Sequence, residues 1–207
     1  MMDTPYELDA YCCILADGDF PTHPVPLRLL REAPRMVCCD GAARHVADSE
    51  AFIVGDGDSV PPHLRSRLVL VSEQDDNDLT KATRFCLERG WRRIVYLGAT
   101  GRREDHTLGN LSLIVRYYTE MGVDPILCTD YGWFVPATSG TTRFESFKGQ
   151  QVSIFNFGCT ELSTEGLVYP GYAFQQWWQG TLNEAAGTSF SITANGAYLV
   201  FRTYQQK

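Results

Sequence analysis

The sequence predicts a chain of two parts, an N-terminal α/β domain with a parallel sheet followed by a C-terminal all-β domain. In the first two-thirds, short apolar runs that do not alternate in polarity are separated by helical patterns. Such runs are typical of strands in a parallel sheet that is covered on both faces. After about Pro136, strand-like runs follow one another with no convincing helical pattern between them. The expected domains are residues 1–136 and 137–207.

Six brief apolar runs, rich in Val, Ile, Leu and Cys, are the expected strands of the first domain. They are Tyr11–Leu15, Met36–Cys39, Phe52–Val54, Leu68–Val71, Ile94–Leu97 and Ile126–Cys128. Two segments between them have apolar residues at helical spacing, which predicts helices over Leu79–Arg89 and Asp105–Met121. Because strands and helices alternate along the chain, this domain belongs to the α/β class.

Five runs separated by Gly, Asn and Ser are the expected strands of the second domain. They are Thr141–Phe147, Gln151–Phe157, Gly166–Tyr169, Phe190–Thr193 and Tyr198–Tyr204. Asn195-Gly196, between the last two runs, predicts a hairpin, because both residues tolerate positive φ. The second domain is therefore expected to consist of strands and turns.

Composition and charge restrict the class of protein. Of the 207 residues, 44% are hydrophobic and 21% are charged, which is ordinary for a soluble globular protein. No run reaches the ~20 apolar residues that a membrane span requires, and Met1–Asp9 lacks the pattern of a signal peptide. The net charge of −7 disfavours nucleic-acid binding. We therefore expect a cytoplasmic protein with no nucleic-acid or membrane partner.

The seven cysteines are expected to be core thiols. Their number is odd and none has C-x-x-C spacing, which argues against a disulfide framework and against a structural zinc site. Most lie in apolar strand-like runs, where a cysteine behaves as a small hydrophobic residue.

Acidic side chains follow three of the predicted strands at the point where each strand ends. They are Asp40 after Met36–Cys39, Asp56 and Asp58 after Phe52–Val54, and Asp75, Asp76 and Asp78 after Leu68–Val71. The carboxyl ends of parallel strands share one edge of the sheet, where ligands bind. Two carboxylates about 4 Å apart repel by roughly 4 kcal/mol at an effective dielectric near 20, so a tight cluster requires a cation.

Mg²⁺ is the cation that fits the segment Gly55–Ser59 best. It prefers hard oxygen ligands and is usually bound by one or two carboxylates together with substrate phosphates. In extended chain Asp56 and Asp58 point the same way, and Gly57 has no side chain that would crowd a phosphate. The alternative is an acidic turn, for which this composition is also suitable. Because three strand ends are acidic, we favour a metal site in a nucleotide-binding domain.

Asp78 and Lys81 lie where the helix over Leu79–Arg89 is expected to begin. Asp78 is a candidate N-cap, whose carboxylate would accept from the backbone N–H of Thr80 or Lys81. A lysine in the first helical turn is mildly unfavourable against the helix dipole, which fits a phosphate ligand at this helix start. The alternative for Lys81 is a solvated surface lysine.

A glycine-containing loop, Gly98-Ala99-Thr100-Gly101, connects a predicted strand to the last predicted helix. Such a loop exposes backbone N–H groups to an anion, and Arg102 and Arg103 are suited to bind phosphate oxygens. The loop is not a Walker A motif and lacks the full G-x-G-x-x-G fingerprint. Asp105 alternatively caps the helix that follows, and we do not assign His106 as a base.

Aromatic residues are concentrated in one part of the second domain. They are Tyr169, Tyr172, Phe174, Trp177 and Trp178. Such a group indicates either a core or subunit interface, or a stacking platform for a flat, cationic heterocycle.

Four stretches, in their order and spacing, resemble the thiamin pyrophosphokinase family, and the resemblance covers nearly the whole chain. They are residues 39–43, 54–59, 73–82 and 98–110. The resemblance implies that the pyrophosphoryl group of ATP is transferred to the thiamine hydroxyl, giving thiamine diphosphate and AMP. It also implies an α/β ATP domain followed by a β-sandwich, with thiamine held between the subunits of a homodimer.

The resemblance also implies roles for individual residues. Asp78, Lys81, Arg103 and Asp105 match catalytic positions, and Asp56, Asp58 and Asp78 match the ligands of Mg²⁺. The expected binding residues for ATP and thiamine are Asp40, Gln74, Gly98, Thr100, Gly101, Arg102, Thr181 and Asn183. Asn183 aligns with an asparagine that contacts thiamine, and Thr181 is near enough to replace the serine that precedes it in the family. Val168 and Leu182 depart from the family pattern, which has a basic residue and that serine.

The implied chemistry is in-line attack by the thiamine hydroxyl on the β-phosphorus of ATP, which depends mainly on positioning and charge stabilisation. Either Asp78 or Asp105 would take the hydroxyl proton. One alternative is a pyrophosphokinase that acts on a hydroxymethylpterin. Another is a non-catalytic sensor that binds nucleotide or thiamine diphosphate.

Overall fold

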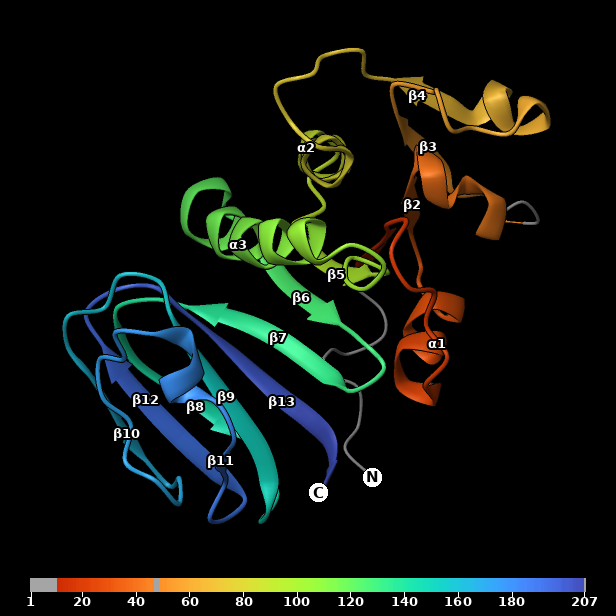
Figure 1. Ribbon diagram of the computed structural model, residues 1–207. Coiled ribbons are helices and arrows are strands. Elements are labelled where there is room, and N and C mark those ends of the chain that lie inside the picture. Colours follow the sequence, from red (N-terminus) through yellow and green to blue (C-terminus); the bar gives the residue numbers. More distant parts are fainter. Residues whose placement is uncertain (1–10, 47–48, 207) are drawn as a thin grey trace. The chain divides into compact units, whose positions relative to one another are not determined.

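The computed structural model describes residues 11–46 and 49–206 (Figure 1). The acidic segment Met1–Asp9 lies outside the described residues. The chain divides into two compact units. The first consists of the residues up to Ile114 together with Gly122–Asp130, and the second consists of Val115–Met121 together with the residues from Tyr131 onward.

The first unit contains six parallel strands in the order β6-β5-β1-β2-β3-β4. Their bounds are β1 Cys12–Leu15, β2 Met36–Cys39, β3 Phe52–Gly55, β4 Leu68–Leu70, β5 Arg93–Leu97 and β6 Asp124–Cys128. Every residue of β1 is fully buried, as expected of a central strand without polar alternation. The six predicted strands are thereby confirmed to within two residues at each end.

The helices of the first unit lie on both faces of its sheet, with α1 and α2 on opposite sides (Figure 1). Their bounds are α1 Pro24–Arg31, α2 Asp78–Glu88 and α3 Glu104–Met121, with the 3₁₀ helices η1 Asp40–His45 and η2 Pro62–Arg67. The last residues of α3, Val115–Met121, belong to the second unit. Helix α1 was missed by the sequence analysis. It begins at the N-cap His23, whose ring nitrogen accepts from the backbone N–H of Val25, with Pro24 in the first helical position.

The predicted N-cap of α2 was wrong by one residue. Asn77 is the cap, and its side-chain oxygen accepts from the backbone N–H of Thr80 at 3.0 Å. Asp78 is instead the first residue of the helix, where its negative charge is favourable against the helix dipole. Asparagine and aspartate are both favoured at the N-cap position, so only the backbone geometry decides which of the two residues caps the helix.

The cysteines are confirmed as buried residues. No disulfide joins any of them within the described ranges, and all seven are buried. Burial raises the pKa of the Cys13 and Cys39 thiols well above the ordinary value, so both are neutral at physiological pH.

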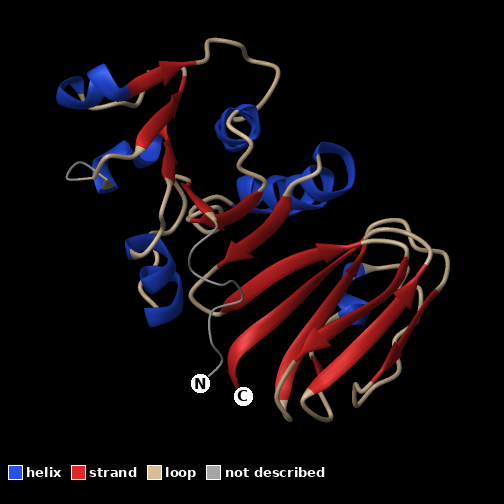
Figure 2. Cartoon of the chain, turned by 180° about the vertical axis from the view of Figure 1, so that it is seen from behind, coloured by secondary structure: helices blue, strands red, loops and turns tan. Residues whose placement is uncertain are grey.

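The second unit is a β-sandwich of two antiparallel sheets (Figure 2). One sheet has the order β11-β9-β13-β7, with β11 Asn183–Glu184, β9 Gln150–Asn156, β13 Tyr198–Gln206 and β7 Gly132–Ala137. The other has the order β10-β12-β8, with β10 Leu162–Glu165, β12 Ser189–Ala194 and β8 Gly140–Glu145. Their shared core contains Val152 and Ile154 from the first sheet and Phe190 and Ile192 from the second. Strands β7, β10 and β11 were not predicted.

The expected strand over Gly166–Tyr169 was wrong. The strand β10 lies just before it and ends at Glu165, because Gly166 has a left-handed φ of 79° that breaks the extended chain. Leu167 makes only an isolated bridge to Ala185. Strand β7 runs across residue 136, where the sequence predicts the domain boundary, and belongs to the second unit.

A search of the described residues for a membrane-spanning helix found none of sufficient length and hydropathy.

Candidate active site

A cavity of about 530 Å³ opens at the carboxyl edge of the sheet in the first unit. Its walls come from the loops that follow β1, β2, β3 and β5, and from the first turns of α2 and α3. This is the edge at which parallel sheets bind ligands, and the order of strands reverses here, between β1 and β5. The cavity therefore lies where the sequence predicted that the acidic strand ends would meet.

Three carboxylates meet in this cavity, from Asp40, Asp56 and Asp58. Each offers an oxygen, and these oxygens lie within 4.8 Å of one another. The backbone N–H of Gly57 donates to Asp40 Oδ2 at 3.1 Å, and that of Asp58 donates to Asp56 Oδ1 at 3.3 Å. These backbone contacts hold the oxygens together in spite of their charge.

Asp40 is the most deeply buried of the three carboxylates. It is only 3% exposed, and its burial, together with the charges of Asp78 and Asp58, raises its pKa to about 6 against the opposing hydrogen bond from Gly57. A Cβ on Gly55 would lie 2.7 Å from Asp40 Cγ, so this position accommodates the carboxylate only as glycine. Three carboxylate oxygens at this spacing are the donor set that a small hard cation such as Mg²⁺ prefers. The residues therefore fit a divalent cation.

Asp78 lies beside this cluster but is paired with a lysine. Lys81 Nζ lies 3.4 Å from Asp78 Oδ1, on the next turn of α2. Lys81 is buried, with only 4% of the residue exposed, so the alternative of a solvated surface lysine was wrong. Metal binding by Asp78 stays a prediction. A buried ammonium one turn into a helix beside acidic groups can neutralise a phosphate that enters the cavity.

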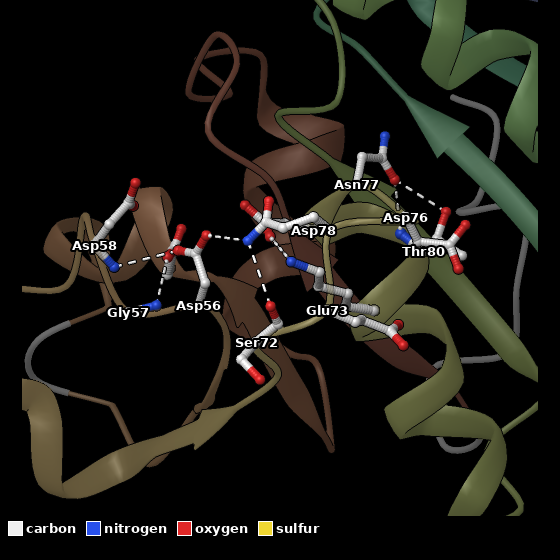
Figure 3. Close-up of polar contacts among 12 residues, drawn as sticks. Asp56, Gly57, Asp58, Ser72, Glu73, Asp76, Asn77, Asp78 and Thr80 are labelled. Carbon is white, nitrogen blue, oxygen red and sulfur yellow. Dashed lines mark hydrogen bonds and ion pairs between the residues drawn. The ribbon is translucent and has the colours of Figure 1, made fainter.

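Gln74 lies in the loop between β4 and α2 and contacts Asp56 of the acidic cluster. Figure 3 shows Asp56 beside Gly57 and Asp58, with Ser72 of this loop nearby. Gln74 Nε2 donates to Asp56 Oδ2 at 3.2 Å, and this hydrogen bond is the main cause of the lowered pKa of Asp56. The same loop is fastened to α2, because Arg84 forms ion pairs with both Glu73 and Asp76. The loop thus holds Gln74 against a candidate metal ligand.

The glycine-containing loop after β5 has three residues with left-handed backbone. The φ angles are 62° at Gly98, 79° at Gly101 and 58° at Arg102. All three residues line the cavity together with Arg103, whereas Thr100 is tied to the loop after β1, where its carbonyl accepts from the N–H of Asp19. The loop therefore brings two arginines to the cavity, and arginine is suited to bind an anion.

Arg103 and Asp105 form a bidentate ion pair. Arg103 Nε donates to Asp105 Oδ1 at 3.1 Å, and Nη2 donates to Oδ2 at 2.6 Å. The hydrogen bond from Arg103 is the main cause that lowers the pKa of Asp105 to about 2. A carboxylate held this way is a weak proton acceptor.

Asp17 is a cavity residue that the sequence analysis missed. It follows Ala16 in the loop after β1, lines the cavity, and forms ion pairs with Arg44 and Arg102. The signal that could have found it is the one that identified Asp40, an acidic residue at the end of a predicted strand. Asn77, His106 and Asn110 also line the cavity.

Thr181 and Asn183 lie in the second unit, apart from the other predicted residues along the chain. The side chain of Asn183 is buried and bonded to the backbone of Tyr169, accepting from its N–H at 3.1 Å and donating to its carbonyl at 2.8 Å. Thr181 Oγ1 donates to the carbonyl of Trp178 at 2.7 Å. Asn183 therefore braces the segment that carries Tyr169, and ligand contact by either residue stays a prediction.

The aromatic group of the second unit is largely exposed. Trp178 is 73% exposed and Tyr169 is 64% exposed, whereas Phe174 is buried in the sandwich core. Leu182, which departs from the family pattern, is also exposed and has a left-handed φ of 61°. Of the aromatic residues in this group, only Phe174 is part of the core. The exposed aromatic side chains remain available to a ligand or a partner.

Two family models match the chain and together span both units. The model described as "Thiamin pyrophosphokinase, catalytic domain" matches residues 27–123, and "Thiamin pyrophosphokinase, substrate-binding domain" matches residues 132–201. Thiamin pyrophosphokinase 1 of Caenorhabditis elegans is 32% identical over an alignment of 104 residues, and the match covers 43% of this chain and 43% of that protein. The match thus spans less than half the length of this curated relative.

Solved structures share the fold over almost the whole chain. Thiamine pyrophosphokinase from Bacillus subtilis has a TM-score of 0.75 at 20% identity, covering 94% of this chain and 99% of that one. The yeast enzyme has a TM-score of 0.78 at 15% identity, covering 96% and 87%. Thiamin pyrophosphokinase from Candida albicans has a TM-score of 0.76 at 16% identity, covering 96% and 90%. The predicted combination of an α/β unit and a β-sandwich is confirmed by these likenesses.

Proposed function

The chain belongs to the thiamin pyrophosphokinase family, and we propose from this that it transfers the pyrophosphoryl group of ATP to the hydroxyl of thiamine. The products are thiamine diphosphate and AMP. The observation that carries this proposal is the presence, in one chain, of matches to the catalytic and the substrate-binding models of one family. The carboxylate cluster at the carboxyl edge of the sheet supports it, because a nucleotide that transfers phosphorus groups is bound together with a metal.

Asp40, Asp56 and Asp58 would hold Mg²⁺, with Asp78 as a further candidate. When bound, the cation supplies Lewis-acid stabilisation of negative charge on the phosphates of ATP. Gln74 keeps the Asp56 carboxylate oriented through its hydrogen bond at 3.2 Å. Without a cation, the cluster would repel the polyphosphate, so we expect nucleotide binding to depend on the metal.

Three cationic residues, two of which line the cavity, would bind the polyphosphate. Lys81 is buried beside Asp78, while Arg102 and Arg103 line the cavity from the loop after β5. Positioned cations of this kind act on the charge that develops in the transition state. The backbone N–H groups of the glycine-containing loop would bind further phosphate oxygens.

Asp78 is the better candidate of the two carboxylates for accepting the proton of the thiamine hydroxyl. Asp105 is bonded through both oxygens to Arg103, and this contact lowers its pKa to about 2. Asp78 makes a single, longer ion pair with Lys81 at 3.4 Å, and its side chain is 39% exposed. We therefore assign proton acceptance to Asp78 and the orientation of Arg103 to Asp105.

The second unit would bind thiamine and join the subunits of a homodimer in the cytoplasm. Its exposed aromatic side chains are suited to stack on a flat cation such as the thiazolium ring. Thr181 and Asn183 lie in the same segment as Leu182, next to these aromatic residues in sequence. Residues 1–136 and 137–207 are proposed as the ATP-binding and the thiamine-binding domains, except that β7, which crosses this boundary, belongs to the second unit.

The test is to incubate the protein with Mg²⁺, ATP and thiamine, and to identify the products by chromatography. We expect equal amounts of AMP and thiamine diphosphate, and none when EDTA replaces Mg²⁺. ADP in place of AMP would contradict pyrophosphoryl transfer. AMP that forms only when a hydroxymethylpterin replaces thiamine would change the acceptor, and saturable nucleotide binding without any AMP would indicate a sensor.

A further inference from the structure

The loops that follow β1 and β5 are joined along the rim of the cavity by three backbone hydrogen bonds. Ala16 N donates to Leu97 O at 2.9 Å, Gly18 N to Gly98 O at 2.6 Å, and Asp19 N to Thr100 O at 2.9 Å. A Cβ on Gly18 would lie 2.3 Å from Thr100 O, so the two backbones approach as closely as glycine allows. Asp17, in the middle of this contact, therefore has a fixed backbone.

One carboxylate oxygen of Asp17 contacts two arginines from different elements. Arg102 Nη1 donates to Asp17 Oδ1 and also to the backbone carbonyl of Asp17, both at 2.8 Å. Arg44, from η1, donates through Nη2 to the same Oδ1 and through Nη1 to the carbonyl of Gly41 at 2.5 Å. Asp17 thus sets the direction of two guanidinium groups.

Stability does not account for this arrangement. The side chains of Asp17, Arg44 and Arg102 are between 38% and 45% exposed, and ion pairs between exposed side chains contribute little to stability. Arg102 also has a left-handed φ of 58°, which is unfavourable for a residue with a Cβ. Backbone of this kind is found where a site requires a side chain in one place.

Arg102 brings positive charge to an acidic cavity. Asp17 and Arg102 line the cavity that also contains Asp40, Asp56 and Asp58. A polyphosphate entering it would approach the carboxylates through a bound cation and Arg102 directly. An arginine held in one direction loses less freedom when it binds phosphate than one that must be ordered.

We propose that Asp17 is a positioning residue for the nucleotide, which holds Arg102 in the direction that meets the polyphosphate of a nucleoside triphosphate. This rests on the proposed function for the choice of ATP as the nucleotide. Asp17 acts through Arg102 and contacts no reacting atom. The proposal concerns binding only, so it predicts an effect on nucleotide affinity and on KM for ATP, with kcat little changed.

The test is Asp17→Asn, which keeps the size of the side chain and removes its charge. We expect the Kd for ATP with Mg²⁺, measured by calorimetry, and the KM for ATP to rise about tenfold, because a charge-assisted contact is lost. Glu120→Gln is the matched control, because it removes an exposed ion pair with Arg116 on α3, and we expect no change in either constant. Tighter ATP binding in Asp17→Asn would show that Asp17 only repels the nucleotide, and would overturn the proposal.

A double-mutant cycle separates positioning from a structural role. If Asp17 acts through Arg102, then Asp17→Asn has no further effect on the Kd for ATP in the Arg102→Gln background. Additive effects would overturn the proposal, as would a lower Tm of Asp17→Asn with an unchanged Kd. The cycle uses ATP binding alone, so a wild type that binds ATP but makes no thiamine diphosphate contradicts the proposed function and leaves this test intact. A wild type that does not bind ATP contradicts both.

Discussion

The backbone N–H of Gly57 donates to the carboxylate of Asp40 at 3.1 Å, joining the loop after β3 to the end of β2. Gly57 has a left-handed φ of 82°, which turns the chain so that its N–H and the flanking Asp56 and Asp58 face the same cavity. The acidic cluster is thus held by backbone contacts that do not depend on a bound cation. Its geometry is present before a ligand arrives.

Asp58→Ala is expected to lower turnover by at least about a hundredfold, because it removes a ligand of the candidate metal site. Asp58 is exposed, so the Tm is expected to stay within about 2 °C. Product formation and thermal unfolding measure the two effects. Asp124→Ala is the matched control, because this exposed aspartate begins β6 at the opposite edge of the sheet. A nearly normal rate in Asp58→Ala would remove the metal-site hypothesis.

Lys81→Met is expected to lower kcat/KM by about 10²–10³-fold, since it removes a buried cation from the proposed phosphate site. Stability is expected to be unchanged or slightly higher, because the desolvation cost of the ammonium is removed and the half-exposed Asp78 carboxylate can be hydrated. Steady-state kinetics and chemical denaturation measure these effects. Lys148→Met, at an exposed position of the second unit, is the control. A loss of folding together with activity would assign Lys81 a structural role.

Asp130→Ala is expected to destabilise the first unit by about 1–2 kcal/mol at pH 7. The carboxylate accepts from the backbone N–H groups of Thr22 and His23 at 2.9 Å and from the hydroxyl of Thr22, and so ties the start of α1 to the end of β6. Thermal unfolding at several pH values is the measurement, with Asp124→Ala again as the control.

The pH dependence of this effect follows from the pKa of Asp130. Burial raises the pKa, but the hydrogen bonds from His23 and Thr22 outweigh burial and lower it below the ordinary value. The native state therefore binds fewer protons than the unfolded chain between the two pKa values, and stability rises with pH there. The difference between wild type and Asp130→Ala should be complete at pH 7 and shrink as the pH falls below about 4. A difference that grows at low pH would contradict this account.

Gly18→Ala is expected to cost about 1–3 kcal/mol of stability and to weaken ATP binding, because its Cβ would lie 2.3 Å from Thr100 O and 2.4 Å from Gly98 O. Both atoms are backbone, so the loops after β1 and β5 must separate. Gly187→Ala is the control, since a Cβ there meets nothing within 4 Å. Normal ATP binding by a folded Gly18→Ala would show that the cavity does not depend on this close approach.

The strands of the first unit could be predicted from the sequence because their residues are buried on both faces. Met36–Cys39 was predicted with its observed bounds. A short apolar run between polar segments is typical of a buried strand, and the polar residues mark its ends. The sandwich was harder to predict. Strand β10, Leu162–Glu165, has one buried residue among polar ones, and β11 has only two residues, so neither carries a clear periodic pattern.

The acidic part of the site could also be predicted, because three strand ends carry aspartates and parallel strands end at one edge. The burial of Lys81 could not, since it depends on how α2 packs against the sheet and not on its own neighbours in sequence. The hydrogen bonds of the Asn183 amide could not be predicted for the same reason, because its partner Tyr169 lies 14 residues away. The choice of Asn77 over Asp78 as the cap depends on backbone angles that both side chains tolerate.

Strand β1 lies between β2 and β5, with Cys13 opposite Met36 and Cys12 opposite Ile94. On the ribosome its first partner follows soon after it, but its second partner comes about 80 residues later. At roughly 5–20 residues per second, one side of this wholly apolar strand stays open for about 4–16 s during synthesis. An open strand edge is a template for pairing with other chains. The nascent protein is therefore expected to need chaperone protection until β5 has emerged.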